Sequence, residues 1–202
     1  MTHPEPPHSL WEVMSTRGIA SASHGFASMV GRPIQATTPA MHLMPLAEVP
    51  ALFGQLEKNV VGISLNITGA LKGQMVLVLT HDRACELTDM ILGEPHGTTQ
   101  TIGSLETSVL GELGNLTGSF FLNAVVSYAH IDVRPSPPTV MEAKLSVLFE
   151  QFTVARDVNR VVVVLNVAFL SAQQEVQASF WILPDSTQTY MWVPTAMPFA
   201  VN

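Results

Sequence analysis

The chain has 202 residues, of which 47% are hydrophobic and 12% are charged, and its formal net charge is −7. A chain this apolar can bury a sizeable core, which excludes an extensively disordered protein. Its acidity and its scattered Lys and Arg residues argue against nucleic acid or an anionic membrane surface as a partner.

Export and membrane insertion are not expected from the sequence. The first ten residues, MTHPEPPHSL, lack the basic and apolar regions of a signal peptide, and residues 1–9 are expected to be flexible. The longest apolar runs, such as VVVVLNVAFL at 161–170, are far shorter than the ~20 residues of a transmembrane helix. The single cysteine, Cys85, excludes an internal disulfide and favours a reducing compartment. We therefore expect a cytoplasmic protein with no membrane insertion.

The first half of the chain predicts a helix, an extended segment and a hairpin, in that order. Residues 10–39 are typical of a long helix followed by an extended segment, because the proline at their end forces its predecessor out of the helical conformation. Residues 60–82 contain two short β-branched runs on either side of the polar turn GALKG, as in a hairpin. Residues 81–95 then predict a short helix that Asp82 caps and Gly93 ends.

The second half repeats this plan at a period of about a hundred residues. Residues 105–138 predict a long helix and an extended segment with two prolines at its end, and residues 161–185 predict a hairpin. Asn66 and Asn166 are expected at equivalent positions in the first strands of the two hairpins.

This repetition predicts an α+β fold built as a pseudo-two-fold duplicated domain. The domain is expected to span residues 10–202, as two similar halves at about 10–100 and 101–202. Neither half has an apolar face that it could bury alone, so we expect long helices packed on a shared, mainly antiparallel sheet.

The predicted helix that begins near residue 105 mixes polar residues with glycines. At 100° per residue, four polar side chains form one narrow stripe: Ser108, Glu112, Asn115 and Ser119. The core face is expected to consist of Leu105, Val109, Leu113, Leu116 and Phe120. The flank of the stripe away from the core face carries Gly111, Gly114 and Gly118, each of which costs a helix roughly 1 kcal/mol relative to alanine.

Three glycines on one flank indicate a close approach there by another helix of the domain or by a partner's backbone. Periodicity alone leaves open ordinary helix packing beside a solvated stripe.

The spacing of these residues is more specific. Ser108, Glu112 and Asn115 are followed by 21 residues and then Pro137, an S-x3-E-x2-N-x21-P arrangement. This arrangement and the segment GELGNLTGSF resemble the signature of the CheC/CheX/FliY phosphatases of bacterial and archaeal chemotaxis. The segment at 31–54 and the strands QMVLVLT and FWILP are also similar to that family. The likeness extends from about Leu10 to Met191, and the chain most resembles a single-site CheC-like protein.

The resemblance implies an enzyme that hydrolyses the aspartyl phosphate of a CheY-type response regulator. Asn115 would position the attacking water, and Glu112 would dock at the regulator's active site and orient the pair. A general-base role for Glu112 is left open. Ser108, Gly111, Gly118 and Ser119 would contact the partner, with the glycines leaving the helix flank clear, and Pro137 would have a structural role at the entry to a strand.

The resemblance also bears on cofactors and partners. It implies no cofactor of the chain's own and Mg²⁺ on the partner response regulator, and it makes a CheD-type deamidase a possible second partner. The seven histidines have no metal-ligand spacing, so no metal site is expected.

One feature departs from the family. CheC proteins commonly carry a second copy of the site, but the first half places Val13 and Thr16 where Glu and Asn are expected, or Glu12 and Ser15 in the neighbouring alignment. We therefore expect one working site. The alternative function is a catalytically weak adaptor that binds a response regulator, a receptor deamidase or a component of the flagellar switch.

Overall fold

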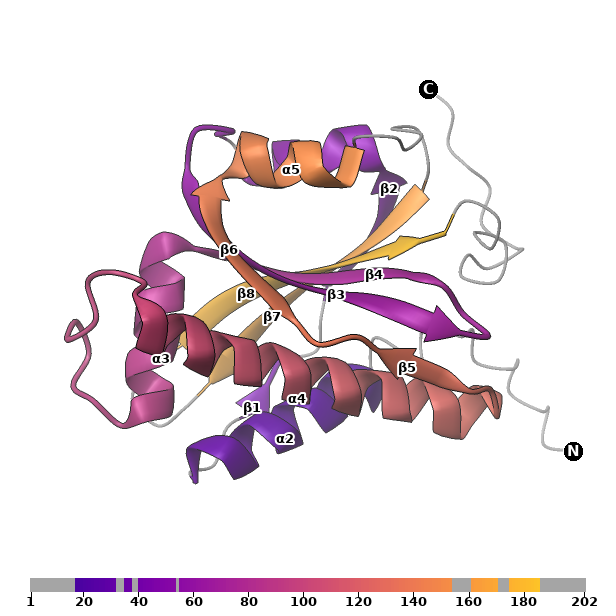
Figure 1. Ribbon diagram of the computed structural model, residues 1–202, viewed down its shortest axis with the longest axis horizontal. Helices are drawn as coiled ribbons and strands as arrows, with labels where there is room; N and C mark the ends of the chain where they lie inside the picture. Colours follow the sequence, from indigo (N-terminus) through magenta and orange to yellow (C-terminus); the bar gives the residue numbers. More distant parts are fainter. Residues whose placement is uncertain are drawn as a thin grey trace, which may run out of the picture.

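The computed structural model describes residues 17–31, 35–37, 40–53, 55–153, 161–170 and 175–185, and these residues form three layers (Figure 1). A twisted antiparallel sheet lies in the middle. On one face lie the helices α2 (Ile19–Val30), α3 (His81–Leu92) and α4 (Ser104–Ala129). On the other face lie the 3-10 helix η2 (Leu46–Phe53) and the helix α5 (Leu145–Thr153). Each face of the sheet buries its own apolar cluster.

The two halves of the chain exchange edge strands. The central strands form two hairpins, β3 (Asn59–Gly69) with β4 (Gly73–Thr80) and β7 (Val161–Leu170) with β8 (Glu175–Pro184), which meet where β4 pairs with β8. The first-half strands β1 (Gln35–Ala36) and β2 (Ala40–Pro45) pair with β7 of the second half. The second-half strands β5 (Val133–Pro135) and β6 (Thr139–Lys144) pair with β3 of the first half. This topology confirms the predicted α+β fold with one shared antiparallel sheet.

Matching hydrogen bonds relate the two halves. After β1, the Thr37 N–H donates to Ala168 O (2.9 Å), and the Ala168 N–H donates to Thr37 Oγ1 (3.0 Å). After β5, the Ser136 N–H donates to Asn66 O (2.8 Å), and the Asn66 N–H donates to Ser136 Oγ (2.9 Å). Asn66 therefore corresponds to Ala168, and the predicted equivalence with Asn166 is wrong by two residues. Matching asparagine to asparagine failed because strand pairing, not residue type, sets the register.

The helix ends show which local predictions hold. The helix predicted over 81–95 is α3, and Gly93 follows it in the left-handed conformation (φ 75°), as expected of a C-terminal glycine. The cap at its start is Thr80, whose Oγ1 accepts from the Arg83 N–H, so the prediction of Asp82 as the cap is wrong. At the start of α4, Glu106 Oε2 accepts from the Gly103 N–H (2.9 Å).

A buried carboxylate holds the connection between α3 and α4. Asp89 is fully buried, and it accepts from the N–H groups of Gly97 (2.8 Å), Thr98 (3.1 Å) and Thr99 (2.8 Å). Burial by itself raises the pKa of Asp89, but the hydrogen bonds from these three residues outweigh it, so the pKa is lowered. The ionised carboxylate therefore fixes the loop that leads into α4.

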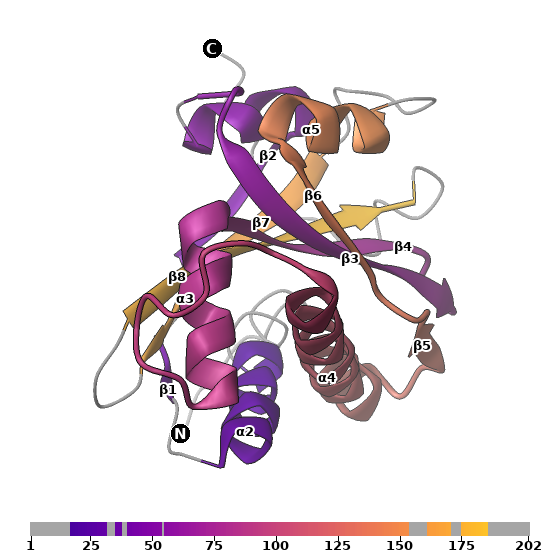
Figure 2. The same cartoon turned by 60° about the vertical axis from the view of Figure 1, so that its left-hand side comes forward.

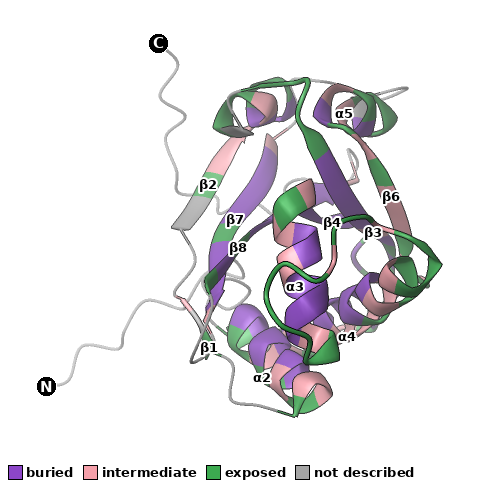
Figure 3. Cartoon of the chain, turned by 90° about the vertical axis from the view of Figure 1, so that its left-hand side faces the viewer, coloured by how far each residue is buried: buried purple, intermediate pink, exposed green. Residues whose placement is uncertain are grey.

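The buried face of α4 differs from the predicted one. The buried residues are Leu110, Leu113, Gly114, Thr117, Gly118, Phe121, Leu122 and Val125. Of the five predicted core residues, Leu113 is buried, Leu105 is 58% exposed and the other three are half-buried. The sequence was misleading because much of the side that packs on the sheet consists of small residues. Figure 3 shows the buried sides of α2, α3 and α4 turned toward the sheet and one another.

Among the described residues, one helical stretch, Ser104–Ser127 of α4, is long and apolar enough to cross a membrane by length and composition. In the structure 44% of an 18-residue window of that stretch is buried inside the protein, and the helix packs against the sheet and α2. Its apolar side is therefore used in the protein's own core.

Candidate functional site

The four polar residues of the predicted stripe lie on the outer side of α4. Ser108 and Glu112 are exposed, and Asn115 and Ser119 are half-buried. The side of the helix opposite them, centred on Leu110, Thr117 and Phe121, is buried. Glu112 and Asn115 are three residues apart on one helix, so their side chains project from neighbouring turns on the same side.

Glu112 and Asn115 are not engaged by any residue in the described part of the chain. Among the residues that the structure describes, neither side chain makes a hydrogen bond or an ion pair. The Ser108 hydroxyl, in contrast, donates to Ser104 O in the same helix (2.9 Å). A carboxylate and an amide thus stand side by side with their hydrogen-bonding capacity open to solvent or to another molecule.

The glycines of α4 face the protein's own sheet. A Cβ at Gly118 would lie 2.3 Å from Leu65 Cδ2, and one at Gly114 would lie 2.3 Å from Ile63 Cγ2. Both glycines are buried against β3, so the prediction that Gly118 clears the flank for a partner is wrong. The close approach is real, but it brings the helix backbone to the sheet. Gly111 is half-buried, and a Cβ there would lie 3.7 Å from Val140 Cγ2 of β6.

The proline of the motif, Pro137, and the next residue, Pro138, lie in the connection beside this helix. Pro137 and Pro138 connect β5 to β6, and a Cβ at Gly114 would lie 3.5 Å from Pro138 Cβ. Pro137 is exposed at the bend, where its carbonyl accepts from Ser136 Oγ (3.0 Å). The fold therefore brings the proline end of the sequence pattern next to its helical part.

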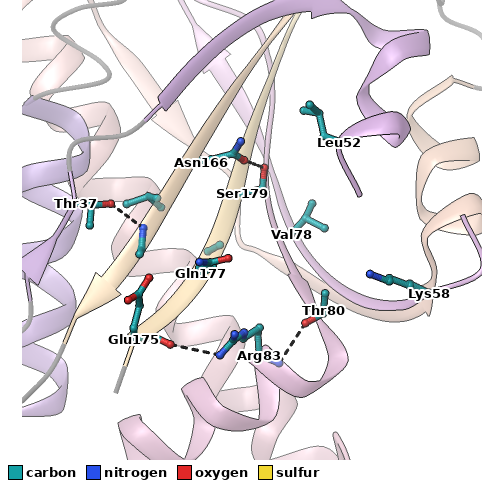
Figure 4. Close-up of a pocket in the computed structure, with 13 residues that line it drawn as sticks. Thr37, Leu52, Lys58, Val78, Thr80, Arg83, Asn166, Glu175, Gln177 and Ser179 are labelled. Atoms are coloured by element: carbon teal, nitrogen blue, oxygen red, sulfur yellow. Dashed lines mark hydrogen bonds between the residues drawn. The ribbon is translucent and has the colours of Figure 1, made fainter. Parts of the chain in front are cut away.

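A hollow lies on the face of the sheet opposite to α4 (Figure 4). Its volume is about 630 Å³, and its polar lining includes Lys58, Thr80, Arg83, Glu175, Gln177 and Ser179. Ser179 is two residues from Trp181, which packs on Phe152 of α5. The hollow therefore opens on the α5 side of the sheet, away from the stripe. The sequence pattern did not indicate it.

Two other predictions concern residues or groups outside this stripe. The first-half residues Glu12, Val13, Ser15 and Thr16 lie outside the described residues. In the part of the chain that the structure describes, no three His, Cys, Asp or Glu side chains are grouped so as to hold a metal ion.

Comparison with known proteins shows which proteins this chain is similar to. No family model matches the sequence. The CheY-P phosphatase CheC of Bacillus subtilis (strain 168) is 25% identical over 173 residues, which are 83% of either chain. The structure of FliY from Thermotoga maritima has a TM-score of 0.77 to this chain at 19% identity, over 94% of this chain and 96% of that one. The chain is therefore similar in sequence to a CheC protein, and it shares its fold with FliY, CheX and CheC-like proteins.

A further structure of the same fold comes from a complex that contains CheY. A chain of the CheX–CheY–BeF3–Mg²⁺ complex from Borrelia burgdorferi has a TM-score of 0.53 to this chain at 12% identity, over 84% of this chain and 96% of that one. At this identity the likeness establishes the shared fold.

Proposed function

We propose that this CheC-like chain is a phosphatase that hydrolyses the aspartyl phosphate of a CheY-type response regulator. The observation that carries the proposal is a pair of side chains on the outer side of α4, Glu112 and Asn115, that no described residue engages. The relative that is named a CheY-P phosphatase and the family complex that contains CheY support this substrate class.

Asn115 is the proposed catalytic residue. Hydrolysis of an acyl phosphate needs a water held in line with the bond that breaks, and the regulator's own Mg²⁺ neutralises the developing charge. A side-chain amide both donates and accepts hydrogen bonds, and it does not titrate at neutral pH. Asn115 therefore orients the attacking water, and the gain is one of position rather than of proton transfer.

Glu112 is the proposed docking residue. Its exposed carboxylate lies one turn before Asn115, so a cation at the rim of the regulator's phosphorylation pocket that pairs with it also brings Asn115 to the phosphoryl group. Ser108 and Ser119 extend the same outer stripe, and Pro138 lies beside the helix at Gly114.

The test of the proposal is Asn115→Ala. We expect the stimulated rate of regulator dephosphorylation to fall roughly 100-fold, because misplacing a reacting water is worth about that much. Binding of a beryllofluoride-activated regulator should be retained. Asn59→Ala, a matched change at an exposed position in β3, should keep the wild-type rate. A wild-type rate with Asn115→Ala would exclude this mechanism.

The second candidate is an adaptor with little catalysis. It is favoured by the likeness to FliY and by Val13 and Thr16 in place of a first-half Glu and Asn. A wild-type protein that binds the activated regulator but does not speed its dephosphorylation would support the adaptor. A CheD-type deamidase is a further proposed partner in either case. The compartment proposed for both functions is the cytoplasm, which fits a chain with one cysteine.

A further inference from the structure

An exposed cation, Arg17, lies near the other end of the helix layer from Glu112. Arg17 lies two residues before the start of α2 and is exposed. It makes no hydrogen bond or ion pair with any described residue. It lines a groove between α2 and the C-terminal part of α4.

This groove has a defined shape and a polar rim. Its volume is about 540 Å³, and its lining includes Arg17, Ser21, Phe120, Asn123 and Ser127. Phe120 forms an aromatic wall, while Asn123 and Ser127 are exposed donors on the same helix as the stripe.

Glycines on α2 fix the walls of the groove. A Cβ at Gly25 would lie 2.3 Å from Phe120 Cδ2, and one at Gly18, the residue before α2, would lie 2.6 Å from Phe121 Cδ2. The rings of α4 thus rest on the backbone of α2 and of the residue that precedes it. Because the two helices pack this closely, the position of Arg17 relative to α4 is set by the core.

The groove and the proposed site share one helix, so their separation follows from helix geometry. Phe120 and Asn123 lie eight and eleven residues after Glu112 in α4. At 1.5 Å per residue, the groove begins roughly 12–16 Å from Glu112 along the helix. The helix layer therefore presents a carboxylate at one place and a guanidinium at another, at a fixed spacing.

We infer that this groove binds an acidic side chain of the same response regulator whose phosphoryl group meets Asn115. The inference rests on the proposed function and adds a second docking point to it. Arg17 can hold a carboxylate through two parallel N–H donors, and Asn123 and Ser127 supply further donors beside it. The occupant is a carboxylate because the charged residue that lines the groove, Arg17, is a cation. Glu112 is proposed to pair with a cation of the regulator, and Asn115 to act at its phosphoryl group. The opposite charges then admit the regulator in one orientation.

The experiment compares two charge reversals, Arg17→Glu and Lys58→Glu. Lys58 is also exposed, but its carbonyl accepts from the N–H of Leu145 at the start of α5, so it belongs to the opposite layer. We expect Arg17→Glu to raise the KM for the phosphorylated regulator about tenfold, with kcat within about twofold of wild type, and to weaken the dependence of KM on salt. Lys58→Glu should leave KM, kcat and the salt dependence of KM unchanged. Circular dichroism should show both variants folded.

Two further outcomes separate this inference from the proposed function. An unchanged KM with Arg17→Glu, while Asn115→Ala still loses turnover, would overturn the second docking point and leave the phosphatase intact. A charge swap gives the positive result: one regulator Asp or Glu, changed to Lys, restores binding to Arg17→Glu. If no acidic position of the regulator restores it, the acidic occupant is wrong.

Discussion

At the scale of the residue, the structure divides its carboxylates into those that hold the fold and those that are left free. Asp89 is buried and saturated by the N–H groups of Gly97, Thr98 and Thr99, and its pKa is lowered. Glu112 is exposed and unengaged among the described residues. A group that already satisfies three donors of its own protein has little capacity for a partner, so Asp89 positions α4 while Glu112 is available to bind.

Asp89→Asn should destabilise the protein at neutral pH. An amide cannot accept all three N–H bonds as the carboxylate does, so we expect the free energy of unfolding to fall by roughly 2 kcal/mol at pH 7. Because the folded pKa lies below the ordinary 3.8, this contribution is present above that value and is lost as the pH falls through the folded pKa. Urea unfolding of wild type and variant should therefore differ at pH 7 and converge in acid. Glu94→Gln, at an exposed loop position, is the control.

At the scale of the element, glycines set the rotation of α4. Ile63 and Leu65 of β3 reach toward the helix at Gly114 and Gly118, where no side chain stands between helix and sheet. With those glycines turned inward, Glu112 and Asn115, which lie roughly 60–160° further round the helix, face outward. The glycines thus act on the site indirectly, through the orientation of the helix.

Gly118 and Gly111 offer a matched pair of substitutions. Gly118→Ala should lower the free energy of unfolding by about 1–3 kcal/mol, because a Cβ would clash with Leu65 Cδ2 and also lie 3.2 Å from Met75 Cε. Gly111→Ala should be neutral or stabilise by up to about 1 kcal/mol, since its Cβ has room and alanine favours the helix. Chemical denaturation measures both. Equal effects at the two positions would contradict the packing explanation.

The elements that could be predicted from the sequence are those with a strong periodic or turn signal. The two hairpins, α4 and the end of α3 at Gly93 were found in this way. The helix α5 and the 3-10 helix η2 were not predicted. The first follows β6 without an intervening turn, and the second contains Pro50, which is typical of an extended segment. The spacing predicted which residues form the polar stripe. It did not predict which side of α4 is buried, because that depends on how the helix packs on the sheet.

At the scale of the whole molecule, contacts between the halves hold the layers together. His81, which begins α3, joins Glu142 of β6 through Nδ1 (2.6 Å) and Gln100 O, before α4, through Nε2 (3.2 Å). Burial by itself lowers the pKa of His81, but the Gln100 carbonyl and the Glu142 carboxylate outweigh it, so the pKa is raised. His81 therefore links the helix of one half to the edge strand of the other. Figure 2 labels the two elements, α3 and β6, on the cartoon of the chain.

His81→Gln should remove a part of the pH dependence of stability. A raised folded pKa means that the contribution is complete below the unfolded value of about 6.5 and is lost as the pH rises through the folded pKa. Because the pair is partly exposed, we expect a difference below about 1 kcal/mol between wild type and variant, present near pH 6 and smaller near pH 9. Denaturant titrations over this range measure it. A gap that grows with pH would contradict the assignment.

The exchange of edge strands also governs when the protein can fold during synthesis. When the ribosome has made β3 and β4, the partners of β3 on its outer side, β5 and β6, do not yet exist, and β2 has no β7 to pair with. The nascent first half carries apolar strands with open edges, which are prone to aggregate. Productive folding waits for β8, the last central strand, so this chain has a high contact order and a long period in which chaperones can act on it.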